Sequence, residues 1–164
     1  MPTKRRSTRP ISFVAVSPLL DATNLRILKE LQADPRLPTA RVARRVRMSA
    51  PAVTERVQRM REAGVIAGFR MELDPRALGL PVAAYVRIRP TPGQLSRVAE
   101  LAQKIPQVVE CHRITGEDCF LLKIHVAEVQ LIEAILDRFL AYGQTTTSIV
   151  QSSPVPPRAL PLPG

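Results

Sequence analysis

The sequence lacks tryptophan, contains only two cysteines, and has few aromatic residues, which make up 4% of its 164 positions. Two cysteines are too few for a disulfide scaffold, and the hydrophobic residues, 45% of the chain, suffice for ordinary apolar cores. We therefore expect a globular protein in a reducing, cytoplasmic compartment. No apolar run approaches the length of a membrane-spanning helix, so we expect no membrane partner.

Metal-binding and catalytic patterns are also missing from the sequence. Cys111, His112, Cys119 and His125 lack the paired short spacings of a structural zinc site, and an alternating pattern places several of them on strands. We find no glycine-rich phosphate loop, no Ser/His/Asp set and no carboxylate pair. The sequence therefore predicts no metal, no cofactor and no enzymatic activity.

The first residues resemble a secretion signal only superficially. Basic residues at positions 4–9 precede an apolar stretch at 11–20, but Ser12 and Pro18 interrupt that stretch and no small-residue cleavage site follows. We interpret residues 1–17 as a flexible basic arm, which either follows the minor groove of DNA or is an unspecific charged tail.

What the chain has in excess is positive charge, with a formal net charge of +10 at pH 7. Residues 1–64 carry fourteen Lys and Arg against five Asp and Glu, whereas residues 65–164 carry ten against nine. A positive surface attracts the phosphates of nucleic acid, and it would also attract an anionic membrane. The arrangement of the helices in this first part has to decide between these partners.

Three short helices are predicted in the basic part. The first begins at Asp21, a typical N-cap, and stops before Pro35; the second begins after Thr39 and is rich in arginine. The third has Pro51 in its first turn and ends at Gly64. Three helices with a tight turn before the last are typical of a helix-turn-helix, whose last helix enters the major groove while the second crosses the phosphate backbone.

Candidate DNA contacts follow from this geometry. We expect phosphate contacts from Arg41, Arg44 and Arg45. The residues that begin or line the outer face of the third helix are Ser49, Ala52, Thr54, Glu55, Arg56, Gln58 and Arg59. Among them, an arginine at 56 or 59 would recognise guanine and the glutamine adenine, while the hydroxyls would contact a base or a phosphate. A merely solvated helix face is the alternative, but seven arginines between positions 41 and 61 favour DNA contact.

From residue 65 onward the hydrophobic period changes to two. Residues 65–66 and 69–73 are predicted to form a strand or extended arm that ends at Asp74-Pro75 and acts as a hinge. Beyond the hinge we predict strands at 82–88, 108–114, 120–126 and 145–150, and helices at 98–105 and 132–139. This β-α-β-β-α-β order is that of a ferredoxin-like domain, with both helices on one face of a four-stranded sheet. The other face must be covered, which favours self-association.

The expected fold class is therefore α+β, with an N-terminal three-helix helix-turn-helix domain and a C-terminal ferredoxin-like βαββαβ domain. The predicted boundaries are 1–17 for the arm, 18–64 for the helix-turn-helix, 65–80 for the hinge strand and linker, 81–152 for the ferredoxin-like domain and 153–164 for a proline-rich tail. Prolines exclude a helix or a central strand in the tail. We expect a solvated extension there rather than a ligand for another protein.

Several motifs between Leu20 and Val150 keep a recognisable order and spacing. They are Leu20-Asp21 with Ile27-Leu28, Leu31 to Arg36, Val53 with Arg56-Val57, Gly64 to Phe69, Leu73-Asp74-Pro75 with Leu78-Gly79, and Thr115-Gly116 followed by Phe120 to Lys123. In this order the chain resembles the Lrp/AsnC, or feast/famine, family of transcriptional regulators. The resemblance implies a dimer whose C-terminal sheets pack together, often assembled into octamers, with an amino acid or related small molecule bound between dimers.

The resemblance also implies an effector site. Its candidate residues are Thr115, Gly116, Glu117 and Asp118 in one loop, and Thr145 and Thr147 in the polar run 145–148. A glycine turn can bring backbone N–H groups close to a carboxylate, and the two acidic side chains could accept from an amino group. An ordinary hairpin turn explains the glycine equally well.

Three departures from the family's pattern bear on function. Asn24 stands where the family often has Asp, and Arg47-Met48-Ser49 replaces a commoner Gly-Leu-Ser, which changes the charge near the DNA face. Cys119 occupies a position where many members have Asp, while Asp118 lies one place earlier. A displacement by one residue turns a carboxylate toward the other side of a strand, so the effector differs or is absent.

Two other functions stay open at this point. Some proteins that resemble the family are sirohaem decarboxylases, which need histidines over a tetrapyrrole; here His112 and His125 fall on predicted strands, where a surface or partly buried histidine is ordinary. A non-catalytic assembly scaffold is the third possibility, and the arginine cluster argues against it. We therefore predict a sequence-specific, oligomeric DNA-binding transcriptional regulator whose partners are double-stranded DNA and a small-molecule effector.

Overall fold

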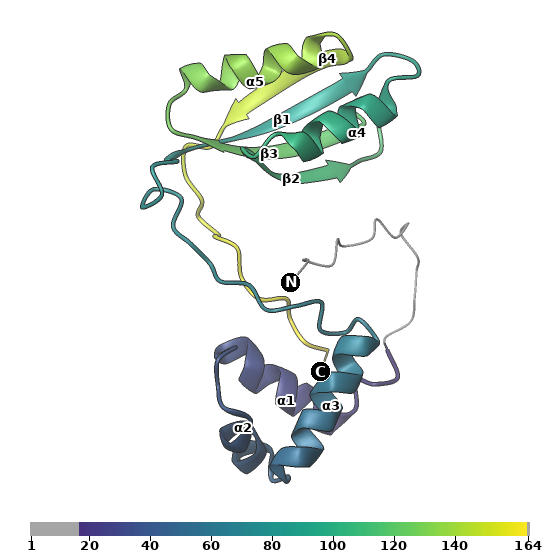
Figure 1. The fold of residues 1–164 in the computed structure, drawn as a ribbon, viewed down its shortest axis with the longest axis vertical. Coiled ribbons are helices and arrows are strands. Elements are labelled where there is room, and N and C mark those ends of the chain that lie inside the picture. Colours follow the sequence, from purple (N-terminus) through teal and green to yellow (C-terminus); the bar gives the residue numbers. More distant parts are fainter. Residues whose placement is uncertain (1–16, 164) are drawn as a thin grey trace. The chain divides into compact units, whose positions relative to one another are not determined.

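The computed structural model describes residues 17–163, which fall into two compact units. The predicted basic arm, up to residue 16, lies outside the described residues. The first unit contains α1 (Ala22–Ala33), α2 (Thr39–Val46) and α3 (Ala50–Glu62) (Figure 1). The second contains β1 (Val82–Pro90), α4 (Leu95–Lys104), β2 (Val108–Arg113), β3 (Phe120–Val126), α5 (Gln130–Leu140) and β4 (Gly143–Ile149). The chain passes from the first unit to the second between Arg70 and Met71, within the predicted hinge.

The three helices of the first unit form as the sequence predicts. Asp21 caps α1, and its side chain accepts a hydrogen bond of 2.7 Å from the backbone N–H of Asn24. Ser49 caps α3 in the same way, accepting from the N–H of Ala52 at 3.4 Å. The apolar faces of the helices meet in a core of buried residues: Ile27, Leu28, Val42, Ala43, Val46, Val53 and Met60. The core fixes α3 against the other two helices.

Of the two forms predicted for the segment after α3, a strand or an extended arm, the strand is not formed. Ile66 packs against the helical core and its N–H donates to the carbonyl of Met60 at 3.1 Å, but residues 67–74 form no helix or strand. Phe69 and Leu73 are each 51% exposed. A strand exists only where a neighbouring strand accepts its backbone hydrogen bonds, and within the described part of the chain this segment has none. Apolar and polar residues do alternate in this segment, but the segment forms no strand in the single chain.

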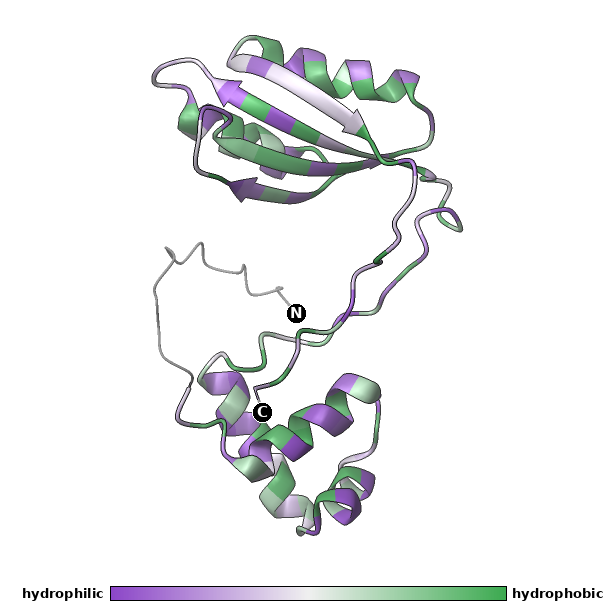
Figure 2. Ribbon diagram, turned by 180° about the vertical axis from the view of Figure 1, so that it is seen from behind, coloured by the Kyte–Doolittle hydropathy of each residue, from purple (hydrophilic) through white to green (hydrophobic). Residues whose placement is uncertain are grey.

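The second unit is the predicted ferredoxin-like fold. Its four strands are antiparallel in the order β2-β3-β1-β4. The helices α4 and α5 cover one face, where alternate residues of the strands, such as Val86, Ile88, Leu122 and Ile124, are buried with Phe139 of α5 (Figure 1). Hydrophobic and hydrophilic residues alternate along the strands in Figure 2. We call the opposite, uncovered face of the sheet the open face.

The start of β4 requires a glycine. A Cβ atom at Gly143 would lie 2.3 Å from the backbone carbonyl oxygen of Arg89, because β4 approaches β1 closely there. That oxygen belongs to the backbone and cannot turn away, so any larger residue would move the strand. The glycine thus fixes where β4 pairs with β1, and with it the register of the threonines that follow.

The proline-rich tail does not end as a solvated extension. Residues from Pro157 belong to the first unit, where Leu162 is partly buried against the helical core and the side-chain amide of Gln32 donates to the carbonyl of Leu160 at 3.1 Å. Prolines hold the tail extended before it binds, so little entropy is lost when Leu162 docks. The expectation of a wholly solvated tail is corrected for these last residues.

We predict that Leu162→Asp lowers the stability of the helical unit by ~1–2 kcal/mol, because a charge would replace an apolar side chain in a partly buried position. Urea unfolding followed by circular dichroism at 222 nm measures this. Leu160→Asp is the matched control, since Leu160 is 80% exposed. Equal unfolding midpoints for the two variants would contradict the docking of Leu162.

Candidate nucleic-acid interface and effector site

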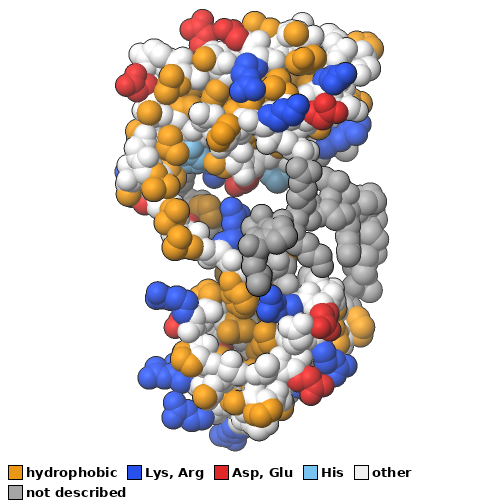
Figure 3. Space-filling view, in the orientation of Figure 1, with side chains coloured by type: hydrophobic (Ala, Val, Ile, Leu, Met, Phe, Trp, Pro, Cys, Tyr) orange, Lys and Arg blue, Asp and Glu red, His pale blue; other side chains and the backbone are white. Residues whose placement is uncertain are grey.

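The outer face of α3 is polar and accessible. Val53 and Met60 face the core, whereas most of the residues predicted to contact DNA are exposed: Arg41, Arg44, Arg45, Ser49, Thr54, Glu55, Gln58 and Arg59. Ala52 and Arg56 are partly buried. The space-filling view shows Lys and Arg side chains along the edges of the helical unit (Figure 3). The structure thus brings the predicted α2 and α3 side chains together on one helical unit.

Three of these side chains already have partners within the unit. Arg45 of α2 forms an ion pair with Glu30 of α1. The side-chain amide of Gln58 donates to the carboxylate of Glu62 at 2.7 Å, along the exposed surface of α3. Arg59 lies 4.0 Å from the Glu55 carboxylate, a loose contact that leaves its guanidinium accessible.

Arg41 and Arg44 differ from these, because neither has an acidic partner among the residues that the structure describes. Both lie on the exposed side of α2, opposite its buried residues Val42 and Val46. An exposed, unpaired guanidinium is free to approach a phosphate without first breaking an internal ion pair. Of the three arginines predicted to contact phosphates, these two are therefore the ones without an acidic partner in the described part of the chain.

Arg56 has a different place from the one that the sequence predicts. Its guanidinium donates to the Asp21 carboxylate at 2.8 Å and to the side-chain oxygen of Asn24 at 3.1 Å. These bonds join α3 to the start of α1, so Arg56 holds the third helix in position. Of the two arginines predicted to recognise guanine, Arg56 is thus bound within the unit, whereas Arg59 makes only the loose contact with Glu55.

Asn24 completes this network and is the buried polar side chain of the helical core, only 4% exposed. Its amide nitrogen donates to the carbonyl of Leu19 at 2.6 Å, while its oxygen accepts from Arg56. Asn24 lies four residues before Leu28 and so falls on the apolar stripe of α1. A polar residue at a core position of a predicted helix is the signal that could have identified the network from the sequence.

The network also shifts an acid–base equilibrium. The backbone N–H of Asn24, and next the Arg56 side chain, hold the pKa of Asp21 below its ordinary value of 3.8. Both donors stabilise the charged carboxylate. The N-cap of α1 is therefore ionised throughout the physiological range.

The predicted effector loop connects β2 to β3. Gly116 has a φ of +108°, and Ile114 donates from its backbone N–H to the carbonyl of Cys119 at 2.9 Å, which closes the loop. Such a left-handed conformation favours glycine. The loop is therefore a constrained turn, as the sequence suggests, although no ligand is required to explain it.

The acidic side chains of this loop pair with arginines that the sequence analysis did not single out. Glu117 forms an ion pair with Arg89, and Asp118 lies 3.7 Å from Arg87 and 3.6 Å from Arg89. Both arginines are exposed residues of β1 that alternate with buried ones, so they lie on the open face. Strict alternation along β1 was the signal that could have placed them beside the loop.

Thr145 and Thr147 lie on the other side of the sheet. In the register of β1 and β4 they pair with Ile88 and Val86, which are buried beneath the helices. Residues directly opposite in an antiparallel pair share a face, so these threonines point away from the loop's arginines. Thr146, which pairs with Arg87, and Ser148, which pairs with Tyr85, are the residues of this run on the open face. Within one chain the structure therefore does not gather the six predicted effector residues into one site.

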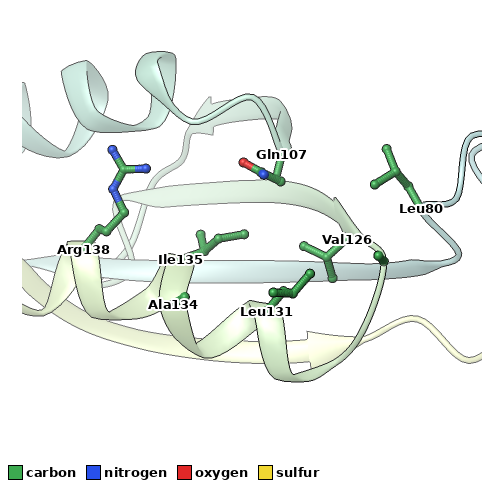
Figure 4. Close-up of a pocket in the computed structure, with 8 residues that line it drawn as sticks. Leu80, Gln107, Val126, Leu131, Ala134, Ile135 and Arg138 are labelled. Carbon is green, nitrogen blue, oxygen red and sulfur yellow. The ribbon is translucent and has the colours of Figure 1, made fainter.

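A separate hollow of about 290 Å³ lies beside α5 in the second unit (Figure 4). Its lining is mostly apolar, with Gln107 and Arg138 as the polar members. None of the predicted effector residues lines it. The hollow is thus a different place from the loop at the end of β2.

Two further searches concern metals and membranes. Across residues 17–163, no three His, Cys, Asp or Glu side chains are grouped so that they could hold a metal ion. His112 lies 3.4 Å from the Glu110 carboxylate, and the Nδ1 atom of His125 is buried without a hydrogen-bond partner. None of the helices in that range combines the length and the apolar character needed to cross a bilayer.

Comparison with known proteins identifies both units. Residues 20–67 match the winged helix-turn-helix DNA-binding domain, and residues 83–160 match the Lrp/AsnC ligand binding domain. The HTH-type transcriptional regulator LrpC of Bacillus subtilis is 33% identical over 133 residues, which cover 81% of this chain and 92% of LrpC. The chain belongs to the Lrp/AsnC family of transcriptional regulators. Its helix-turn-helix makes DNA its partner, as the sequence predicts.

Other family members agree in sequence and in fold. The regulator Rv2324 of Mycobacterium tuberculosis is 42% identical over 123 residues, covering 73% of this chain and 81% of Rv2324. The structure of LrpC superposes with a TM-score of 0.77 over 82% of this chain and 96% of LrpC. The regulator NMB0573 of Neisseria meningitidis, solved as a complex with L-Met, has a TM-score of 0.78 at 26% identity and covers 87% of this chain and 96% of its own. The α+β fold predicted from the sequence is confirmed.

We predict that Asn24→Asp destabilises this family member's helical unit by ~1–3 kcal/mol, because a carboxylate cannot donate to the Leu19 carbonyl and would face that oxygen unpaired. The new carboxylate would attract Arg56, but this attraction adds little because Arg56 already forms an ion pair with Asp21. Thermal unfolding at pH 7 measures the change. An unfolding temperature at or above that of the parent protein would contradict the assigned hydrogen bonds.

Asp21 predicts how stability depends on pH. Because its pKa is lowered on folding, its charged form contributes stability above about pH 4, and this contribution is lost as pH falls through the folded pKa. Asp21→Asn keeps a capping side chain but removes the titration. We expect the variant's stability to fall less steeply than the parent's between pH 4 and pH 2, measured by urea unfolding at each pH. Parallel curves for the two proteins would argue against the lowered pKa.

Proposed function

We propose that this regulator binds double-stranded DNA with α3 in the major groove and α2 across the phosphate backbone. The observation that carries this proposal is the pair of exposed arginines on α2, Arg41 and Arg44, which have no acidic partner within residues 17–163 and lie in the same unit as the polar face of α3. Arg45 joins them at the backbone when it exchanges Glu30 for a phosphate. The exchange of one anionic partner for another costs little at an exposed site.

Base recognition falls to the exposed residues of α3. Arg59 is free to donate to guanine, and Gln58 can turn its amide from Glu62 to adenine. The hydroxyl of Thr54 donates to the carbonyl of Ala50 at 3.0 Å, which leaves its oxygen as an acceptor and its methyl group for a thymine. Ser49, Ala52 and Glu55 complete the face at the start of the helix.

We propose that the protein acts as a homodimer formed through the open face of the sheet, with larger assemblies built from such dimers. Tyr85 is 39% exposed there, and no helix covers this face in the second unit as described. The ammonium group of Lys123 lies 6.0 Å from the Tyr85 ring and 3.9 Å from Glu110. Tyrosine is among the residues that are enriched in protein interfaces.

We propose an amino acid or a related small molecule as the effector, bound at the loop formed by Thr115, Gly116, Glu117 and Asp118. The relative NMB0573 was solved with L-Met, and an α-amino acid carries both charges that this site can bind. Its carboxylate would bind Arg87 or Arg89, and its amino group would bind the acidic side chain released from that arginine. We place Thr146 at this site instead of Thr145 and Thr147, because Thr146 pairs with Arg87 and, unlike the other two threonines, lies on the open face.

We propose that the protein is a cytoplasmic binding protein without catalytic activity. The similar proteins are transcriptional regulators, and among residues 17–163 the one ion pair of a histidine is that of His112 with Glu110. Purification without tetrapyrrole absorbance is the expected result. A bound tetrapyrrole would instead favour the decarboxylase hypothesis.

The test of function is selection from fragmented genomic DNA at two salt concentrations, with and without a mixture of amino acids. Enrichment of a few palindromic sites is expected, with a yield that changes when amino acids are present. Recovery of nothing above background would favour a scaffold that keeps a vestigial helix-turn-helix.

We predict that Arg44→Ala weakens binding to all duplexes alike and reduces the salt slope by about one, because roughly one phosphate contact is lost. Fluorescence anisotropy at four salt concentrations measures both quantities. Arg97→Ala is the control, since Arg97 is an equally exposed arginine on α4 of the second unit. The assignment fails if the slope is unchanged in the Arg44 variant or falls equally in the control.

A further inference from the structure

The turn between α2 and α3 contains an unusual backbone conformation. Arg47, the C-cap of α2, has φ 57° and ψ 52°, in the left-handed region. It is the one residue other than glycine with positive φ among residues 17–163. Its N–H bonds to the carbonyls of Ala43 and Arg44, and the N–H of Met48 bonds to Ala43 at 2.9 Å. These bonds end α2 and turn the chain into α3.

The backbone at this position favours glycine over arginine. A left-handed residue that ends a helix is usually glycine, because a Cβ atom there approaches the adjacent carbonyl oxygen. Asparagine and aspartate tolerate the conformation because their short polar side chains bond locally, which a long arginine does not do. Arg47 therefore carries a conformational cost that glycine would not.

The charge at this position gives little compensation inside the domain. Arg47 follows Arg44 and Arg45, which already place two positive charges in the last turn of α2. The side chain of Arg47 is exposed and makes no hydrogen bond or ion pair with any residue of the described range. Positive charge does suit a helix C-terminus, but the two preceding arginines provide that already, and a third adds repulsion.

The position of Arg47 indicates a role for its positive charge in binding a phosphate. It lies two residues before Ser49, the N-cap of α3, at the junction of the helix that crosses the DNA backbone and the helix that enters the groove. The left-handed turn takes Arg47 out of the helical surface that carries Arg41 and Arg44. A phosphate at the beginning of α3 would meet the Arg47 guanidinium together with the partial positive charge of the helix N-terminus.

We propose that Arg47 is a DNA-backbone ligand, held by the left-handed turn so that it binds a phosphate at the N-terminal end of α3. This inference rests on the proposed DNA-binding function and adds a residue that the sequence analysis did not assign to it. Strain that no internal contact offsets is typical of binding positions. Contact of the arginine with DNA offsets the conformational cost of placing a residue other than glycine in this turn.

Two substitutions separate the backbone effect from the charge effect. Arg47→Gly removes both the strain and the charge, and Arg47→Asn keeps a residue that tolerates the conformation while removing the charge. We expect both variants to unfold at a higher temperature than the parent protein. We also expect both to bind duplex DNA several-fold more weakly, with a salt slope reduced by about one. Arg47→Lys should retain the slope of the parent.

The proposal requires that the same substitutions raise the unfolding temperature and weaken DNA binding. A lower unfolding temperature with an unchanged salt slope would overturn the proposal and make Arg47 a structural C-cap of α2. If Arg44→Ala reduces the slope but Arg47→Gly does not, the proposal for Arg47 fails while the DNA-binding function stands. If the parent protein itself shows no salt-dependent binding to duplex DNA, the proposed function fails, and the proposal for Arg47 fails with it.

Discussion

The hydrogen bonds around Asn24 are the constraint on which the DNA-binding unit depends. A polar side chain in a small helical core is tolerated when it is hydrogen-bonded; here the Asn24 amide donates to the Leu19 carbonyl and accepts from Arg56, which also binds the Asp21 carboxylate. Because Arg56 belongs to α3 and the other partners belong to the start of α1, the same bonds that satisfy Asn24 orient the third helix. The orientation of the exposed face of α3 is thus decided by a contact on its inner side.

In the second unit, the alternation of strand residues between the core and the open face determines which side chains are exposed. Each strand sends alternate residues to the helices and to the open face, so Arg87 and Arg89 meet the acidic loop while Val86 and Ile88 enter the core. A sensing site and an assembly surface can therefore share one face without disturbing the core. The close approach of β4 to β1 at Gly143 extends this order to the threonines of β4.

Two places where the structure departs from sequence-based expectation have related causes. The segment 67–74 alternates like a strand but has no strand partner in the single chain, and the tail is rich in proline but ends in a leucine that finds the helical core. In both cases the local sequence has the character that we predicted. Whether the segment finds a partner elsewhere in the chain decides the structure that it adopts. Arg56 belongs to the same group, because its position on α3 is local while its partners lie more than thirty residues earlier in the sequence.

The sequence by itself determined the helix-turn-helix, the βαββαβ order, the excess of arginine and the family, because helical and alternating periods, caps and turn residues act over a few neighbouring positions. Only the tertiary structure decided which arginines are free and which are bonded, which threonine faces the loop, and where the backbone is strained. Those properties depend on pairs of residues far apart in the chain. No local pattern encodes the distance between Arg56 and Asp21, or which of Thr146 and Thr147 shares a face with Arg87.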